Sequence, residues 1–280
     1  MNPEGSFLDI IAEYLTNEEI QLPVFDESAF RIQQEMAKKD PELKLIQKWV
    51  ENDPFLNSQV LRVANSTFYK GLSKVTTVRN AIIRLGASEI SNIVMLITQR
   101  KNFTSKDPFW HDFLNKLWQH STGCAVGAQW LSKQCHFQEY AHEIFTAGLL
   151  HDIGKLLIVK VIEDIHRSEK MDIKPSDALL DEIMNSFHTE HGHSLLKNWN
   201  LPEVYCQIAH DHHSEEIDES NILMVMVRLA NITCNKLGIG LKEDASLMLA
   251  ATPEAHLLGL SEVSLAKLEI ALEDALELSI

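Results

Sequence analysis

The spacing of the apolar residues is the feature that most constrains the fold. Through most of the chain they recur every three to four positions, which places them on one face of a helix rather than on alternate faces of a strand. Only 11 glycines and 8 prolines interrupt the 280 residues. The sequence therefore predicts an all-α fold.

Capping residues mark where several of these helices begin and end. Asp53 followed by Pro54 is typical of a helix N-terminus, and Thr77 offers a second N-cap. Gly86 is typical of a helix C-terminus. We predict that residues 90–97 form a buried helix, although an apolar run of this length also fits a strand.

A long helix is predicted from about Pro108 to Cys135, and His120 lies on its apolar stripe. Gly123 and Gly127 are four residues apart on it and would let a neighbouring helix approach closely. Further helices are predicted over about 144–162, from 176 onward, and from 202 through 213.

The polar stretch 102–108 ends in proline and is the predicted boundary between two lobes. We predict an N-terminal helix at 1–19, a helical lobe at about 20–105 and a histidine-rich lobe at about 106–240. Residues 241–280 are rich in leucine and glutamate and form a predicted amphipathic tail. The expected architecture is a helical bundle with an additional N-terminal helical lobe.

Charge and composition limit the possible partners and location. With 45% hydrophobic residues the chain can bury a core, and its net charge of −15 argues against a nucleic-acid or anionic-membrane surface. The four cysteines have no paired short spacing, so they indicate buried free thiols rather than a disulfide framework or a thiolate zinc site. The N-terminus lacks a secretory pattern and no apolar run approaches about 18 residues, so we expect a cytoplasmic protein.

Histidines carry the strongest chemical signal, because six of the thirteen fall between His188 and His213. A lone histidine on an apolar helix face is usually a core residue with one hydrogen bond. Imidazoles turned inward from four separate segments, with one carboxylate, are what a helical bundle needs to hold a metal. The candidate ligands on the inward faces are His120, His151, Asp152, His188, His212 and His213. We expect one to two divalent ions of iron, manganese, zinc or nickel.

The same residues resemble those of the HD superfamily of metal-dependent phosphohydrolases, which is marked by a histidine, a later His-Asp doublet and a distal aspartate. His120, His151 and Asp152 fit the first three positions. Within that superfamily the chain most resembles the HDOD family, the HD-related output domain of bacterial signalling proteins, over about residues 20–240. The motifs that carry this resemblance are Leu22-Pro23, Asp53-Pro54, Ala64-Asn65-Ser66, Ala81, Leu85-Gly86, Trp118, His120-Ser121, Gly148 to Lys155, His188 with Gly192, Trp199, Leu201-Pro202 and His212-His213.

The chain departs from the HD pattern at two places. Asn231 stands where the distal aspartate is expected, and an amide can ligate a metal but brings no charge. After His213 there is no Gly-Tyr-Pro element of the HD-GYP branch, so hydrolysis of cyclic di-GMP is not implied.

Two functions follow from the resemblance. The first is a regulatory module of bacterial signal transduction with an HD-like metal site, whose partner is a signalling protein or a small phosphate-containing ligand. The second is a metal-dependent phosphohydrolase acting on a nucleotide or another phosphate ester. In that case Asp152 and Lys155 are the catalytic candidates, because Lys155 is a cation within the doublet motif that could meet a phosphate; as a bland alternative, it is a snorkelling helix residue.

Overall fold

The computed structural model describes residues 7–15, 25–69, 71, 73–167 and 175–275, and every regular element in these ranges is a helix. The predicted all-α class is therefore confirmed. The structure describes residues 7–15 of the predicted helix at 1–19. The other residues of that prediction, and the motif Leu22-Pro23, lie outside the described residues. The α-helices span α1 Phe7–Leu15, α2 Glu27–Met36, α3 Leu43–Asn52, α4 Pro54–Ala64, α5 Val78–Leu85, α6 Ala87–Arg100, α7 Pro108–Gln134, α8 Ala141–Leu150, α9 Ile153–Arg167, α10 Asp177–Asn198, α11 Glu203–Asp211, α12 Ile222–Lys236, α13 Pro253–Leu257 and α14 Glu262–Ala275. Two 3₁₀ helices span Gln138–Tyr140 and Leu249–Ala251.

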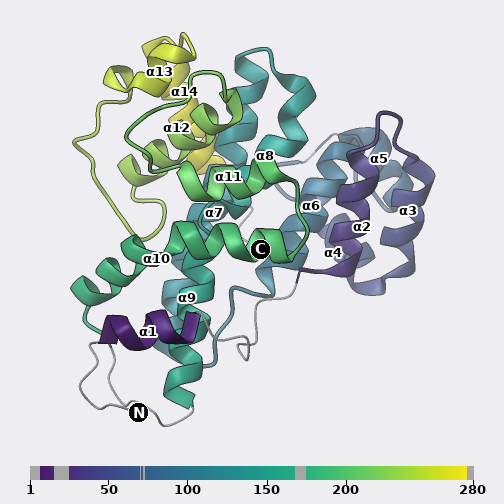
Figure 1. Ribbon diagram of the computed structural model, residues 1–280. Helices are drawn as coiled ribbons and strands as arrows, with labels where there is room; N and C mark the ends of the chain where they lie inside the picture. The colour runs from purple at the N-terminus through teal and green to yellow at the C-terminus, as the bar shows by residue number, and fades with distance from the viewer. Residues whose placement is uncertain (1–6, 16–24, 70, 72, 168–174, 276–280) are drawn as a thin grey trace. The chain divides into compact units, whose positions relative to one another are not determined.

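The helices labelled in Figure 1 belong to two compact units. The first unit comprises Met1–Val24 and Leu150–Glu216; in it α10 packs against α9 and α11, and α1 contacts α9 and α10. The second unit comprises Phe25–Leu149 and Ile217–Ile280; in it α2 to α6 pack on one another, and α7 packs against α12 and α14. The predicted domain boundaries near residues 20, 105 and 240 stay a prediction.

Two predicted N-caps are present. The Asp53 carboxylate accepts hydrogen bonds from the backbone N–H groups of Phe55 at 2.9 Å and Leu56 at 3.0 Å. The Thr77 hydroxyl accepts one from the backbone N–H of Asn80 at 3.1 Å. These side chains satisfy amide groups that have no partner within the helix, and so they fix where α4 and α5 begin.

Gly86 ends α5 and allows the chain to turn directly into α6. Its φ of +87° lies in a region that favours glycine, and the chain bends by 117° from α5 to α6. Residues 90–97 are all buried and helical, so the alternative that they form a strand is wrong. In the described part of the chain no single helix has the length and apolarity to cross a membrane, although α5 and α6 meet that criterion as a bent pair.

The two glycines of α7 allow the close helix packing that their spacing predicted. A Cβ added at Gly123 would lie 2.9 Å from Sγ of Cys234 on α12. One added at Gly127 would lie 3.2 Å from Cβ of Ala230 and 2.8 Å from Leu272 on α14. Larger residues at these positions would push α12 and α14 away from α7.

The prediction of one continuous helix over 144–162 is wrong at its centre. α8 ends at Leu150, α9 begins at Ile153, and His151 and Asp152 form the turn between them. The apolar period gives no sign of this break, because the residues on both sides of the turn are buried. Histidine and aspartate are weak helix formers, and the close contact of α9 with α10 directs the chain at this turn.

Candidate metal centre

Close packing of α9 on α10 positions the acidic residue of the site. A Cβ added at Gly154 would lie 1.9 Å from the carbonyl oxygen of His188, and one added at Gly192 would lie 3.2 Å from the backbone nitrogen of Gly154. Two glycines therefore let the start of α9 touch the backbone of α10. This contact holds the turn that carries Asp152 beside His188.

Asp152 is almost fully buried, with 1% of its side chain exposed. Its Oδ2 lies 2.5 Å from Nζ of Lys155, one helical turn further along the chain, and 3.5 Å from Nε2 of His151. Lys155 therefore forms an ion pair with the carboxylate of Asp152, three residues before it in the chain. This ion pair leaves Oδ1 to face the other histidines.

Backbone carbonyl groups fix the orientation of two buried imidazoles. Nδ1 of His188 lies 2.6 Å from the carbonyl oxygen of Met184, and Nδ1 of His212 lies 3.1 Å from that of Ile208. A carbonyl oxygen only accepts hydrogen bonds, so each Nδ1 carries the proton. In the neutral ring Nε2 then carries the lone pair, which is the form that binds metal.

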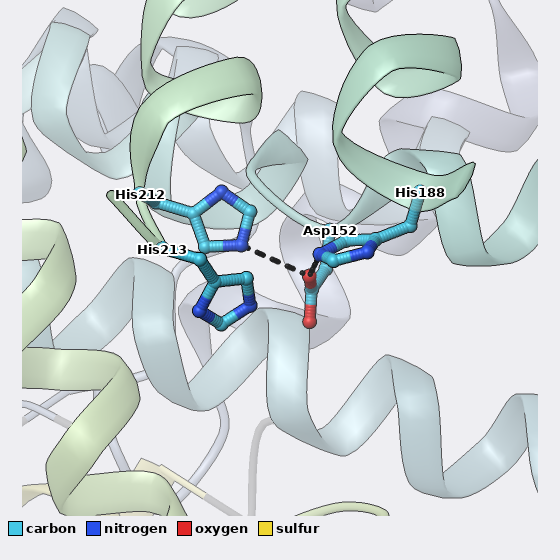
Figure 2. A group of neighbouring side chains, drawn as sticks. All are labelled: Asp152, His188, His212 and His213. Atoms are coloured by element: carbon cyan, nitrogen blue, oxygen red, sulfur yellow. Dashed lines mark ion pairs between the residues drawn. The ribbon is translucent and has the colours of Figure 1, made fainter. Parts of the chain in front are cut away.

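Both Nε2 atoms point at the same carboxylate oxygen, as Figure 2 shows. The distance to Oδ1 of Asp152 is 3.5 Å from His188 and 3.4 Å from His212. Neither Nε2 atom has a hydrogen-bond partner among the described residues. Burial, partly offset by the charge of Asp152, lowers the pKa of His188 to about 4, so this ring is neutral at pH 7.

His213 completes the group from the more exposed side. The predicted helix ends earlier than expected, because α11 stops at Asp211 and His212 caps it. The ring of His213 then lies 4.1 Å from that of His212 and 5.2 Å from that of His188, between ring centres. Burial of the ring, followed by the influence of His212, holds the pKa of His213 below its ordinary value.

These side chains fit a divalent metal ion. One ligand atom from each of Asp152, His188, His212 and His213 lies within 4.8 Å of all the others. Around a tetrahedral ion with ligand distances of about 2.1 Å, neighbouring ligand atoms are about 3.4 Å apart, close to the separations between Asp152 and the two buried histidines. Without a cation, two lone pairs and a carboxylate oxygen would face one another in a buried site, which is unfavourable.

Of the three remaining predicted ligands, His151 lies in the first unit beside Asp152, and the other two belong to the second unit. His120 on α7 is 5% exposed, and its Nδ1 lies 3.0 Å from the carbonyl oxygen of Ile239. Asn231 on α12 is 7% exposed, and its side-chain oxygen lies 3.4 Å from Nδ2 of Asn235. That His120 and Asn231 share an ion with His151 and Asp152 stays a prediction.

The sequence signals missed two ligand-type residues. Cys124 and Cys234 lie 3.7 Å apart, sulfur to sulfur, although 110 positions separate them in the chain. Cys124 follows His120 by four residues on a helix, a spacing that could have linked those two, but nothing in the sequence links either to Cys234. His191, His193 and His210 lie outside the group, and His210 contacts Asp211 at 2.5 Å instead.

Known proteins share this fold. The chain superposes on the structure of an HDOD domain protein of unknown function from Geobacter sulfurreducens with a TM-score of 0.77 and 22% identity, over 97% of this chain and 96% of that one. A protein from Shewanella amazonensis SB2B, described provisionally as a metal-dependent phosphohydrolase, has a TM-score of 0.72 and 16% identity, over 97% of each chain. One from Marinobacter aquaeolei VT8, described provisionally as a signal transduction protein, has a TM-score of 0.70 and 20% identity, over 96% of this chain and 63% of that one. At these identities the likeness shows the fold alone.

A sequence relative and a family match complete the comparison. An uncharacterized protein of Treponema pallidum (strain Nichols) is 24% identical over 220 residues, which are 76% of this chain and 42% of the relative. The chain spans less than half the length of the curated relatives it matches. Residues 22–215 match the HDOD domain. Because this match covers more than half of the chain and agrees with the helical fold, the chain belongs to the HDOD family.

Proposed function

We propose that the chain is a regulatory module of signal transduction whose helical core holds a divalent metal ion at Asp152, His188, His212 and His213. The observation that carries the metal is the convergence of two Nε2 lone pairs on one buried carboxylate oxygen. Backbone carbonyls hold His188 and His212 with Nε2 toward the carboxylate, so these two rings already face the position of the ion. Iron, manganese, zinc and nickel all accept such nitrogen and oxygen ligands.

Burial of the ligands favours a structural and regulatory role for this ion. Asp152, His188 and His212 are each no more than 2% exposed. Structural metal sites are closed by protein ligands, whereas catalytic sites keep a position open for water or substrate. Lys155 further neutralises the only carboxylate of the group. An ion held in this way would join α9, α10 and the end of α11.

The second candidate is a metal-dependent phosphohydrolase, and the exposed side of the group favours it. His213 is exposed, and Lys155, with 12% of its side chain exposed, places a cation next to the carboxylate. A bound ion would polarise phosphoryl oxygens and lower the pKa of a bound water toward about 7. In this reading Asp152 orients and charges the site, and Lys155 attracts and positions the phosphate.

The proposed partner is a signalling protein or a small phosphate-containing ligand. The Marinobacter protein of similar fold, described provisionally as a signal transduction protein, supports the signalling context. The net charge of −15 disfavours nucleic acid and anionic membrane as partners. A cytoplasmic location stays a prediction.

Metal content and turnover, measured on one preparation, decide between the two candidates. We expect elemental analysis of the full chain to show bound transition metal, and less of it in Asp152→Ala than in wild type. We also expect hydrolysis of a generic phosphate ester with excess manganese to be no faster in wild type than in Asp152→Ala. Fast hydrolysis that Asp152→Ala abolishes would instead establish the enzyme, and a metal-free wild type after growth in supplemented medium would overturn both candidates.

A further inference from the structure

The second unit contains its own group of metal-binding side chains. His120 and Cys124 lie four residues apart on α7, and Cys234 reaches them from α12. Both cysteines are 0% exposed and His120 is 5% exposed. Gly123 makes this approach possible, since an added Cβ there would lie 2.9 Å from Sγ of Cys234.

The imidazole of this group is oriented to accept an ion. Its Nδ1 lies 3.0 Å from the carbonyl oxygen of Ile239, so Nδ1 is the protonated nitrogen and Nε2 carries the lone pair. Gly240 follows with a φ of +123°, and a Cβ added there would lie 2.7 Å from Cβ of His120. The loop after α12 therefore packs directly on the histidine and holds its Nε2 3.6 Å from Sγ of Cys124.

Two of the three separations between ligand atoms match those around a tetrahedral metal, and the third lies within 4.8 Å. The two sulfur atoms are 3.7 Å apart, and the nearer sulfur is 3.6 Å from Nε2. With zinc–sulfur distances of about 2.3 Å and a zinc–nitrogen distance of about 2.0 Å, tetrahedral geometry predicts about 3.8 Å and about 3.5 Å for these pairs. A disulfide would need the sulfur atoms to be about 2.05 Å apart, so the pair is present as thiols.

We propose that His120, Cys124 and Cys234 form a second metal site, with two thiolates and one imidazole as ligands for zinc or another thiolate-preferring divalent ion. Two thiolates balance the double positive charge of the ion, so the complete group can be buried without net charge. Its sulfur ligands separate it in metal preference from the nitrogen and oxygen ligands of the first unit.

The proposal changes the assignment of His120. Since Nδ1 is bound to the Ile239 carbonyl, a single nitrogen remains to bind metal. In any one molecule His120 then belongs either to the thiolate site or to the HD-type site predicted with His151. This inference does not rest on the proposed function.

Cobalt(II) added to the reduced full-length chain under anaerobic conditions tests the site, because thiolate ligands give bound cobalt a charge-transfer band in the near ultraviolet. We expect wild type to show the band and Cys124→Ser/Cys234→Ser to lack it. Cys206→Ser removes a buried cysteine of the first unit and should keep the band. A wild type without the band, or a band that survives in the double variant, would overturn the proposal.

A second measurement protects the test against a variant that fails to fold. Zinc-loaded wild type, examined by X-ray absorption at the zinc edge, should show sulfur in the first coordination shell, and Cys206→Ser should show the same sulfur contribution. Zinc surrounded by nitrogen and oxygen alone would contradict the thiolate site whatever the behaviour of the variants.

Discussion

At the scale of single residues, the account depends on Asp152, which has one oxygen bound to Lys155 and the other facing two histidines. We expect Asp152→Asn to weaken metal binding in the first unit about a hundredfold or more. Attraction between unit charges is worth on the order of 4 kcal/mol at about 4 Å and an effective dielectric of about 20, and part of this is lost with the carboxylate.

Isothermal titration calorimetry, with manganese added to the metal-free protein, measures the change in affinity. Asp181→Asn is a suitable control, because Asp181 is an exposed acid on α10 outside the group. Equal affinities in wild type and Asp152→Asn would show that the carboxylate is not a ligand.

Asn231 provides a second test at this scale. The HD pattern places an aspartate at this position, and a carboxylate would add a negative charge to the ligand set. We therefore expect Asn231→Asp to raise the metal content of the purified protein. Asn235→Asp, one helical turn away, is the matched control. If both variants bind as much metal as wild type, position 231 does not contribute a ligand.

At the scale of helices, the site depends on the contact between α9 and α10. We expect Gly154→Ala to destabilise the protein by at least about 1–3 kcal/mol, as overpacking does, and to reduce metal content. The added Cβ would lie 1.9 Å from a backbone oxygen of His188, and backbone atoms move less easily than side chains. Urea unfolding gives the change in stability.

Gly71→Ala is the control for this change, because its added Cβ would meet only the flexible side chain of Arg84, at 3.4 Å. If Gly154→Ala is as stable and as rich in metal as wild type, the close helix contact does not hold the site together.

The packing of α8 on α6 predicts a dependence of stability on pH. Nδ1 of His142 lies 2.7 Å from the Asn92 side-chain oxygen, and burial lowers the pKa of His142 from 6.5 to about 4. As pH falls, His142 is therefore protonated in the unfolded chain before it is protonated in the folded chain. The stabilising contribution is complete above pH 6.5 and is lost as pH falls toward 4.

His142→Gln keeps an amide donor for Asn92 but does not titrate. We expect wild type to lose about 2 kcal/mol more stability than this variant between pH 7 and pH 5. Urea unfolding at both pH values measures the difference. Parallel losses in the two proteins would show that His142 is not buried in its neutral form.

The comparison of sequence with structure has a physical explanation at this scale. The caps at Asp53 and Thr77 and the glycine at 86 act within a few residues, so the sequence displays them directly. The break at His151 and Asp152 arises from the contact of α9 with α10, which local periodicity does not contain. The inward histidines were predictable because burial follows the helical period. The contact between Cys124 and Cys234 depends on α7 packing against α12, and no short spacing in the sequence predicts it.

At the scale of the whole molecule, the N-terminal helices should be required for folding. Glu89 on α6 accepts a hydrogen bond from Gln129 on α7 at 3.0 Å, and Phe103 packs on Trp118 with ring centres 5.1 Å apart. We expect a fragment of residues 106–280 to bind a hydrophobic dye and to unfold without a cooperative transition, because it exposes the surface of α7 that Glu89 and Phe103 contact in the whole chain. The full-length chain is the control. A fragment that stays monomeric and unfolds cooperatively would show that the histidine-rich lobe folds alone.

Anomalous diffraction from crystals of the full chain would locate a metal ion held by Asp152, His188, His212 and His213. Data collected above and below the absorption edge of the metal found by elemental analysis should give a peak enclosed by these four side chains (Figure 2). The peak should disappear in Asp152→Asn. A difference map without a peak there, in crystals grown with excess manganese or iron, would show that these four side chains do not hold a metal ion.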